Sequence, residues 1–299
     1  MLSVKLYYNP RSGEKNGRFK ALASQISKEG FRMVKAVHHK KGLAPISPEL
    51  DLVAVAGGDG TVRRACMELL EQPLSRFRPL GILPLGTANN IARSLNITGT
   101  LTEIIQSWHK RQYRQLNVGR CFSGDEKERF FVEGCGWGLF PQLIQAMVEI
   151  PRQLRNTPDK ELKSALQILR QLTLAGKAYK GTVSVDGKNH RGKFLMAEMM
   201  NIPQIGPRLA LAPDADCGDG YLDVFLLEEH QREAFCQYLD SLIKGKLLMS
   251  PFPTIKARSI QIFWDDLPKM HLDDALLAAK YGNNISIDLL PTSFQFLIG

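Results

Sequence analysis

The chain has 299 residues, of which 44% are hydrophobic and 23% are charged, a composition typical of a soluble globular protein. This length is enough for two domains, each with its own core, and no segment holds the roughly 18 uncharged apolar residues that a membrane-spanning helix needs. The N-terminal segment has no long apolar core or cleavage site, which favours a first strand over a signal peptide. We therefore expect a cytoplasmic protein.

The formal net charge is +9, and it indicates either an acidic partner or simply a soluble basic surface. Nucleotide phosphate, anionic membrane lipid and nucleic acid are the candidate partners at this point. No nucleic-acid-binding motif accompanies the charge, so nucleic acid is not expected to be a partner.

In chain order, the first third alternates predicted strands and helices. The alternation predicts an α/β layer fold with a parallel sheet. Strands are predicted over residues 3–9, 31–39, 51–58 and 79–86, and helices over residues 18–30, 61–72, 87–97 and 101–111.

After about residue 115 most predicted elements are strands, and two helical inserts interrupt them. The strands are predicted over residues 114–122, 129–138, 180–187, 190–201, 220–229, 255–264 and 283–291, and the inserts over 139–178 and 231–249. We therefore predict an α/β domain over residues 1–115, completed by 285–299. A second, mostly β domain with helical inserts is predicted over 116–284.

Cysteine, histidine and tryptophan are not predicted to form a site. The cysteines are odd in number, widely spaced and without a C-x-x-C pair, which favours buried reduced thiols over disulfides or zinc. The histidines have no ligand spacing and are expected at the surface, and the tryptophans are expected in the core. The residues are Cys66, Cys121, Cys135, Cys217 and Cys236; His38, His39, His109, His190, His230 and His271; and Trp108, Trp137 and Trp264.

A glycine loop, Gly57-Gly58-Asp59-Gly60-Thr61, follows the predicted buried strand 51–58. Open α/β sheets bind ligands at this end of their strands, and glycines there let bare N–H groups approach an anion closely. Asp59 would repel phosphate unless a divalent cation lies between them, so the loop suggests Mg²⁺. Thr61 is placed where an N-cap would be. The alternative is a tight strand-to-helix turn with no ligand.

Two more loops leave the same edge of the predicted sheet. Asn9–Gly13 (NPRSG) follows the first strand, and Pro84–Leu95 follows the fourth. In the latter, Gly86 and Thr87 again place a glycine and a hydroxyl at a helix start, and Asn89 follows them. Each asparagine could be a turn former alone, but three converging loops favour phosphate binding.

These motifs together resemble the diacylglycerol kinase catalytic-domain family, which includes bacterial lipid kinases and is related to the sphingosine and ceramide kinases and, distantly, to the NAD kinases. The likeness extends to Asn201–Leu227 (NIPQIGPRLALAPDADCGDGYLDVFLL), to His271–Leu277 (HLDDALL) and to the closing segment 289–298. It covers essentially the whole chain.

The resemblance implies that the first domain is a three-layer α/β nucleotide-binding domain and the second a β-sandwich-like lipid-substrate domain. It implies a kinase that uses ATP and Mg²⁺ to phosphorylate a membrane lipid at an anionic membrane surface, as a peripheral protein of unknown oligomeric state. It assigns Asp273 as the base toward the lipid hydroxyl and Asp59 as the residue that organises Mg²⁺. A second cation loop is implied at Asp216, Asp219 and the Tyr221 carbonyl. The nucleotide would be held by Asn9, Gly57, Gly58, Gly60, Thr61, Gly86, Thr87 and Asn89.

The sequence departs from the family pattern at two sites. Asn90 stands where the family usually has an aspartate, and Asp274-Ala275 replace a Gly-Glu pair, so two acids are missing unless Asp274 takes over a role. Without the resemblance, Asp216 and Asp219 would be interpreted as an acidic turn, and Asp273-Asp274 as a cap on a helix over ALLAAKY.

The helical insert over Glu161–Lys180 has an apolar stripe flanked by basic residues. It is interpreted either as a helix packed on the sandwich or as a basic lid that contacts anionic headgroups. Three functions stay open: a lipid kinase, a kinase of a soluble acceptor such as NAD, and a non-catalytic lipid or nucleotide sensor.

Overall fold

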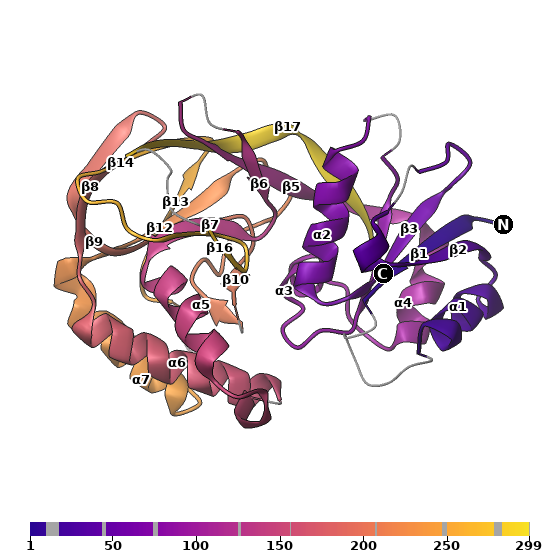
Figure 1. Cartoon of the computed structure of the whole chain (residues 1–299), viewed down its shortest axis with the longest axis horizontal. Coiled ribbons are helices and arrows are strands. Elements are labelled where there is room, and N and C mark those ends of the chain that lie inside the picture. The colour runs from indigo at the N-terminus through magenta and orange to yellow at the C-terminus, as the bar shows by residue number, and fades with distance from the viewer. Residues whose placement is uncertain are drawn as a thin grey trace. The chain divides into compact units, whose positions relative to one another are not determined.

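The chain divides into two compact units, Met1–Leu116 with Thr292–Gly299, and Asn117–Pro291 (Figure 1). This computed structural model describes residues 1–9, 18–43, 46–73, 77–124, 127–155, 157–206, 208–246, 250–277 and 283–298. Residues 10–13 of the predicted NPRSG loop lie outside these ranges. No helix in the described ranges is long and apolar enough to cross a membrane.

The first unit is built on a parallel sheet with the strand order β2-β1-β3-β4-β17. Strand β3 is buried at every residue, as the apolar run LVAVAG predicts for a central parallel strand. The strands are β1 (Ser3–Tyr8), β2 (Arg32–His38), β3 (Leu52–Gly57), β4 (Leu80–Pro84) and the C-terminal end of β17 (Asn284–Ile298).

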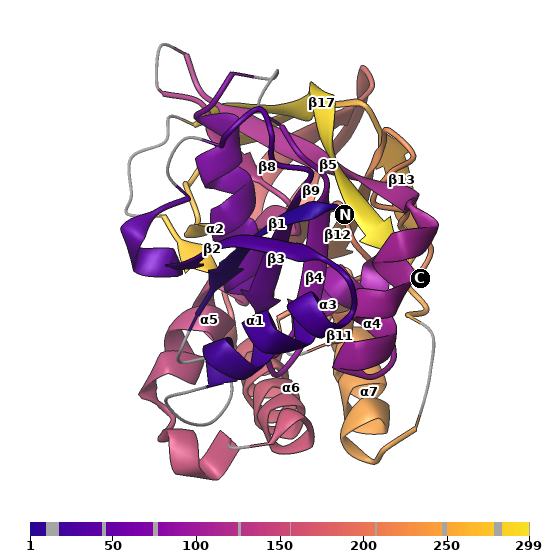
Figure 2. The ribbon, with the colours of Figure 1, turned by 90° about the vertical axis from the view of Figure 1, so that its right-hand side faces the viewer.

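Helices cover both faces of this sheet. Tyr7 and Tyr8 are neighbours on β1 and therefore point to opposite faces. Tyr8 stacks on Phe19 of α1 (Arg18–Lys28), whereas the Tyr7 hydroxyl contacts Glu68 of α2 (Asp59–Leu70) at 3.0 Å. In Figure 2, α1 and α4 (Leu101–Ser107) lie in front of the strands. The predicted three-layer α/β architecture is confirmed.

The second unit is mostly antiparallel β-structure. Its strands run in the order β16-β15-β7-β9-β8-β14-β17, with β12 and β13 joined at β9, and with β6 joined to β5. The strands are β5 (Gln112–Phe122), β6 (Arg129–Phe131), β7 (Gly134–Gly138), β8 (Tyr179–Val185), β9 (Lys188–Met200), β12 (Leu222–Glu228), β13 (Thr254–Ala257), β14 (Ser259–Trp264), β15 (Met270–Leu272) and β16 (Ala275–Leu276), with the short hairpin β10 (Gln204–Ile205) and β11 (Leu209–Ala210).

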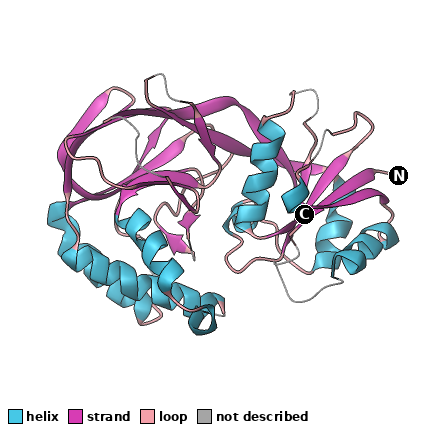
Figure 3. Ribbon diagram, viewed as in Figure 1, coloured by secondary structure: helices cyan, strands magenta, loops and turns pink. Residues whose placement is uncertain are grey.

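Two hydrophobic clusters lie against this β-structure. Met199 on β9 belongs to a cluster formed among the strands, with Trp137 and Trp264, whereas the adjacent Met200 packs in a second cluster with the helices. Figure 3 shows those helices grouped beside the strands. They are α5 (Leu139–Glu149), α6 (Pro158–Ala175) and α7 (Arg232–Ile243). The predicted β-sandwich-like fold of the second domain is confirmed; α5 and α6 lie within residues 139–178, and α7 lies within 231–249.

Several local predictions need correction. The strand predicted over 255–264 is two strands, β13 and β14, separated at Arg258. The alternative interpretation, a helix over ALLAAKY capped by Asp273-Asp274, is wrong at its start, because Ala275–Leu276 form strand β16. The closing strand β17 is continuous through Pro291, and its residues 284–288 pair with β14 in the second unit before Phe296 pairs with β4 in the first.

Candidate active site

In the first unit, the loops after β3 and β4 meet at two glycines. A Cβ on Gly86 would lie 2.5 Å from the Gly58 Cα, and a Cβ on Gly58 would lie 3.0 Å from the Gly86 Cα. The Leu85 N–H also donates to the Gly57 carbonyl at 2.9 Å. Because no side chain fits between the two backbones, these glycines are required by a direct backbone approach and not only by turn chemistry.

Asn9 and Thr61 join the first loop to the second. The Asn9 N–H donates to the Ala56 carbonyl at 3.1 Å, and its side-chain Nδ2 reaches the Thr61 Oγ1 at 3.5 Å. Thr61 is 4% exposed and is the third residue of α2, whose N-cap is Gly58. The predicted N-cap at Thr61 is therefore wrong. A Cβ on Gly57 would lie 2.4 Å from the Thr61 hydroxyl.

Asn89 closes the third loop on itself. It adopts a left-handed backbone with φ of 53°, its Oδ1 accepts from the Gly86 N–H at 2.9 Å, and its Nδ2 donates to the Gly86 carbonyl at 2.8 Å. This ring holds Thr87 at an exposed position of the loop. The helix that follows, α3 (Asn90–Ser94), starts later than the predicted residue 87 because these residues form the turn.

Asp59 links two of the loops through its carboxylate. Its Oδ1 accepts from the Ile91 N–H at 2.9 Å, at the start of α3. Burial raises the pKa of Asp59, and backbone N–H groups at residues 89–91 partly oppose this effect. Asn90 is 2% exposed, so the amide that replaces the expected acid is buried beside this carboxylate. The structure therefore brings together Asn9, the 57–61 loop and the 86–91 segment.

In the second unit, Asp273 is 3% exposed and anchors a neighbouring strand segment. Its Oδ1 accepts from the N–H groups of Val132, Glu133 and Gly134 at 3.1, 2.8 and 3.2 Å. A carboxylate that accepts several backbone hydrogen bonds is a poor proton acceptor. Its neighbour Asp274 is exposed.

His271 is completely buried, which corrects the expectation that every histidine lies at the surface. Its Nε2 lies 2.7 Å from the Glu198 Oε2, and its Nδ1 lies 2.8 Å from the Asp273 carbonyl oxygen. Burial raises the pKa of Glu198, and His271 partly opposes this shift. Burial alone would lower the pKa of His271, but the charge and hydrogen bond of Glu198 raise it overall. The pair supports the turn that carries Asp273 and Asp274.

The predicted second cation loop holds its acids in a turn. The Asp216 Oδ1 accepts from the Gly218 N–H at 3.0 Å, and the Asp219 Oδ1 accepts from the Tyr221 N–H at 2.9 Å. The other Asp219 oxygen lies 2.6 Å from the Lys256 Nζ, which also lies 3.3 Å from the Asp223 Oδ2. Within the described ranges, no three His, Cys, Asp or Glu residues are grouped to hold a metal. The Lys256 ammonium balances only one of these carboxylate charges, but it occupies the Asp219 and Asp223 oxygens that a metal ion would need, so the turn in this form does not fit a metal ion.

Replacing Lys256 with methionine is expected to give this turn an affinity for divalent cations that the native chain lacks. The change leaves Asp219 and Asp223 without their cation, and carboxylate oxygens are the ligands that Mg²⁺ and Mn²⁺ prefer. Thermal unfolding with Mg²⁺ and with a chelator checks this: the variant should be stabilised by the metal, and the native chain should not respond at this turn. A Mn²⁺ signal from the native chain that disappears in Asp219→Asn would contradict it.

Sequence reasoning missed Glu198, His271 and Lys256 as parts of these clusters. Glu198 had a usable signal, since it is the one acid within the apolar run FLMAEMM of β9, where a charged residue needs a buried partner. His271 and Lys256 had none, because their partners lie 73 and 37 residues away along the chain.

Comparisons with known proteins agree with this architecture. Residues 3–121 match the diacylglycerol kinase catalytic domain, and residues 144–287 match the YegS C-terminal NAD kinase beta sandwich-like domain. A diacylglycerol kinase of Staphylococcus aureus (strain MRSA252) is 24% identical over 276 residues, which cover 88% of this chain and 83% of that protein.

Two solved structures share the fold. A diacylglycerol kinase from Bacillus anthracis str. Sterne superposes with a TM-score of 0.71 at 20% identity, over 99% of this chain and 97% of that chain. An NAD kinase from Archaeoglobus fulgidus in complex with ATP has a TM-score of 0.50 at 12% identity, over 99% and 93% of the two chains. With both domains matched in order, the chain belongs to the diacylglycerol kinase catalytic-domain family, a family of ATP-dependent kinases.

Proposed function

We propose that this protein is a lipid kinase that transfers the γ-phosphate of ATP to a hydroxyl of a membrane lipid, diacylglycerol or a related glycerolipid. The observation that carries the proposal is the meeting of the three loops in the first unit, where the Gly58 and Gly86 backbones approach each other at the carboxyl ends of β3 and β4 and at the start of α2. A helix start at such a place favours a bound phosphate. Phosphoryl transfer depends mainly on alignment and charge neutralisation, which such loops supply.

In this proposal the nucleotide phosphates bind along Asn9, Gly57, Gly58, Gly60 and Thr61, and along Gly86, Thr87 and Asn89. Asp59 is suited to hold the Mg²⁺ that accompanies the nucleotide, because it is a half-buried carboxylate at the proposed phosphate loop. When bound, Mg²⁺ would neutralise phosphate charge. We do not extend the metal role to Asp216, Asp219 and Tyr221, since Lys256 already supplies the positive charge there.

The acceptor hydroxyl must lose its proton as the new P–O bond forms and the bond to ADP breaks. Asp273 is the base that the family resemblance assigns, and its three backbone hydrogen bonds favour a positioning role for it. The exposed Asp274 is the adjacent carboxylate that could take the proton. Comparing Asp273→Asn with Asp274→Asn separates the two assignments.

A membrane-bound acceptor is supported by the helical insert over residues 139–178. Val148 and Leu154 are apolar side chains with exposed fractions of 74% and 64%. By contrast, Leu166 and Leu169 of α6 pack in the core, and Arg170 pairs with Asp240 at 2.5 Å. We therefore propose that the exposed apolar residues, rather than the stripe of α6, contact a membrane surface peripherally.

A non-catalytic nucleotide or lipid sensor is the second candidate. It is favoured by Asn90, by Ala275 in place of an acid, and by the engagement of Asp273 with the 132–134 backbone. A kinase of a soluble acceptor such as NAD is supported only by the shared fold.

Transfer of radiolabel from γ-labelled ATP with Mg²⁺ to a panel of lipids in mixed micelles, with NAD as a soluble control, tests these candidates. We expect labelled diacylglycerol or a related lipid, with turnover at least about 100-fold lower in Asp59→Asn because the amide loses the charge that organises the cation. The matched control is Glu71→Gln, an exposed acid at the end of the same helix. Label on NAD alone, or nucleotide binding without any transfer, would overturn the lipid-kinase proposal.

A further inference from the structure

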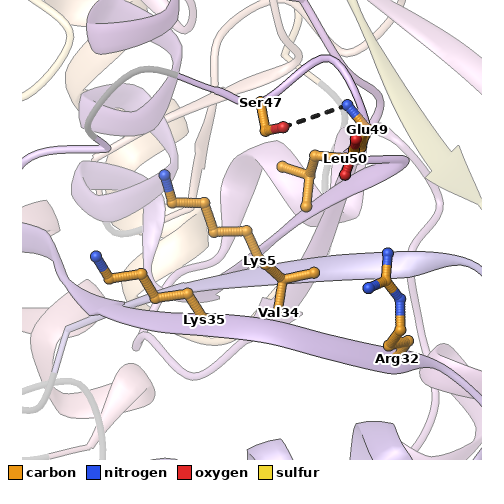
Figure 4. Close-up of a pocket in the computed structure, with 7 residues that line it drawn as sticks. All are labelled: Lys5, Arg32, Val34, Lys35, Ser47, Glu49 and Leu50. Carbon is orange, nitrogen blue, oxygen red and sulfur yellow. Dashed lines mark hydrogen bonds between the residues drawn. The ribbon is translucent and has the colours of Figure 1, made fainter.

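A pocket of about 250 Å³ lies in the first unit, on the sheet edge formed by β1 and β2. Figure 4 shows side chains of these two strands on one side of it and the segment with Ser47, Glu49 and Leu50 on the other. Three cations line it, Lys5, Arg32 and Lys35. None of its lining residues belongs to the loops at 57–61 and 84–95, so the pocket is separate from the proposed nucleotide site.

Lys5 is a buried ammonium without a carboxylate partner in the described part of the chain. Its side chain is only 7% exposed, and its Nζ donates to the Leu43 carbonyl. Burial and, to a lesser extent, the charge of Lys35 lower the pKa of Lys5. A buried charge is costly unless an opposite charge or a ligand compensates it.

The strand register adds a second unfavourable feature. Lys5 on β1 lies directly opposite Lys35 on the parallel strand β2. Like charges at facing positions of neighbouring strands are destabilising. Arg32, three residues before Lys35 on β2, also lines the pocket, and Glu49 is the only acid among its described lining residues and is exposed. The lining therefore carries an excess of two positive charges.

We propose that this pocket binds a phosphate monoester group. Its excess charge matches a phosphate dianion, and arginine supplies the forked donors that suit phosphate oxygens. The Ser47 Oγ accepts from the Glu49 N–H at 3.4 Å, which leaves the hydroxyl hydrogen for the ligand. A volume of about 250 Å³ is below that of pockets for drug-sized ligands, so it suits a small anion or a headgroup. Val34 and Leu50 provide apolar contact beside the phosphate. This binding goes beyond the proposed kinase activity and does not depend on it.

The proposal is tested by ³¹P NMR titration of inorganic phosphate with the full chain, in the presence of saturating ATP to occupy the nucleotide loops. Binding is expected to weaken about tenfold or more in Lys35→Gln, Arg32→Gln and Lys5→Met, because each removes a charge-assisted hydrogen bond. Lys35 and Arg32 are exposed, so these two variants keep the test valid even if Lys5→Met fails to fold. Lys40→Gln, an exposed lysine just beyond β2 that does not line the pocket, is the control and should bind normally.

Sedimentation with phosphatidylcholine vesicles, with and without phosphatidic acid, separates the two sources of the phosphate group. If the pocket variants lose binding of free phosphate, the site is supported and its ligand is a soluble phosphate. If free phosphate binds weakly but the native chain binds phosphatidic acid and the same variants do not, the site is supported and its ligand is a lipid headgroup. Binding that is equal in all variants, or absent with both probes, overturns the proposal.

Discussion

Gly86→Ala is expected to weaken nucleotide binding by at least about tenfold and to lower the free energy of unfolding by about 1 to 3 kcal/mol. The new Cβ would lie 2.5 Å from the Gly58 Cα and 2.8 Å from the Asn89 Oδ1, so the two phosphate-facing loops must separate. Separation also stretches the hydrogen bond from the Leu85 N–H to the Gly57 carbonyl. Titration with a fluorescent ATP analogue and denaturant unfolding measure the two effects.

Gly192→Ala is the matched control, since it adds the same methyl group to a glycine with room for it. Its nearest neighbour would be the Phe194 Cζ at 3.5 Å, an ordinary contact, and it belongs to the second unit. This variant should bind nucleotide normally. If Gly86→Ala bound ATP as well as the control does, the close approach of the two loops could not be what holds the phosphates.

The architecture and the loops of the first unit could be predicted because their signals are local. The apolar run of β3 and the alternation of strands and helices predict a parallel sheet, and the carboxyl ends of its strands then place Asn9, Gly58 and Gly86 at one edge. The sequence could not distinguish turn chemistry from direct backbone contact. That distinction depends on the spacing between Gly58 and Gly86, which are 28 residues apart.

The predicted helix boundaries were wrong where a local turn or strand pairing competed with helix propensity. Thr87–Asn89 were predicted as helical, but Asn89 forms two hydrogen bonds with Gly86, and its left-handed φ means that the helix can begin only at Asn90. Around Asp273 the Ala/Leu run suggested a helix, yet antiparallel pairing of β15 with β16 and with β7 determines the conformation there. Tertiary pairing overrides propensity in such short segments.

The partnership of Glu198 with His271 could not be predicted from the sequence, because it depends on pairing between distant strands. Glu198 on β9 and His271 on β15 are separated in the sheet by β7, whose Gly136 pairs with both residues. A Cβ on Gly136 would lie 2.0 Å from the Glu198 Oε2, so this glycine makes room for the carboxylate. The requirement for glycine at this position follows only from the strand register.

His271→Ala is expected to lower the free energy of unfolding by about 3 to 5 kcal/mol, because it leaves a fully buried carboxylate without its partner. The Glu198 Oε1 has no hydrogen-bond partner among the described residues, so His271 is the group that compensates this side chain. His230→Ala, an exposed histidine on η5 (Glu229–Gln231), is the control and should change stability by no more than about 0.5 kcal/mol. Urea unfolding of both variants at neutral pH gives the comparison.

The pH dependence of stability distinguishes this ionic role from simple loss of packing. The pKa of His271 is raised above its ordinary 6.5, and that of Glu198 is raised above its ordinary 4.5. The folded protein therefore binds protons more tightly than the unfolded chain. His271 contributes its full stabilisation below about pH 6.5, and this contribution is lost as the pH rises through the raised pKa of His271. The raised pKa of Glu198 likewise makes the folded protein less stable as the pH rises. Replacing His271 with glutamine removes one of these groups and should flatten the decline above pH 6.5. An unchanged pH profile in that variant would mean that His271 binds its proton equally tightly in the folded and unfolded chains.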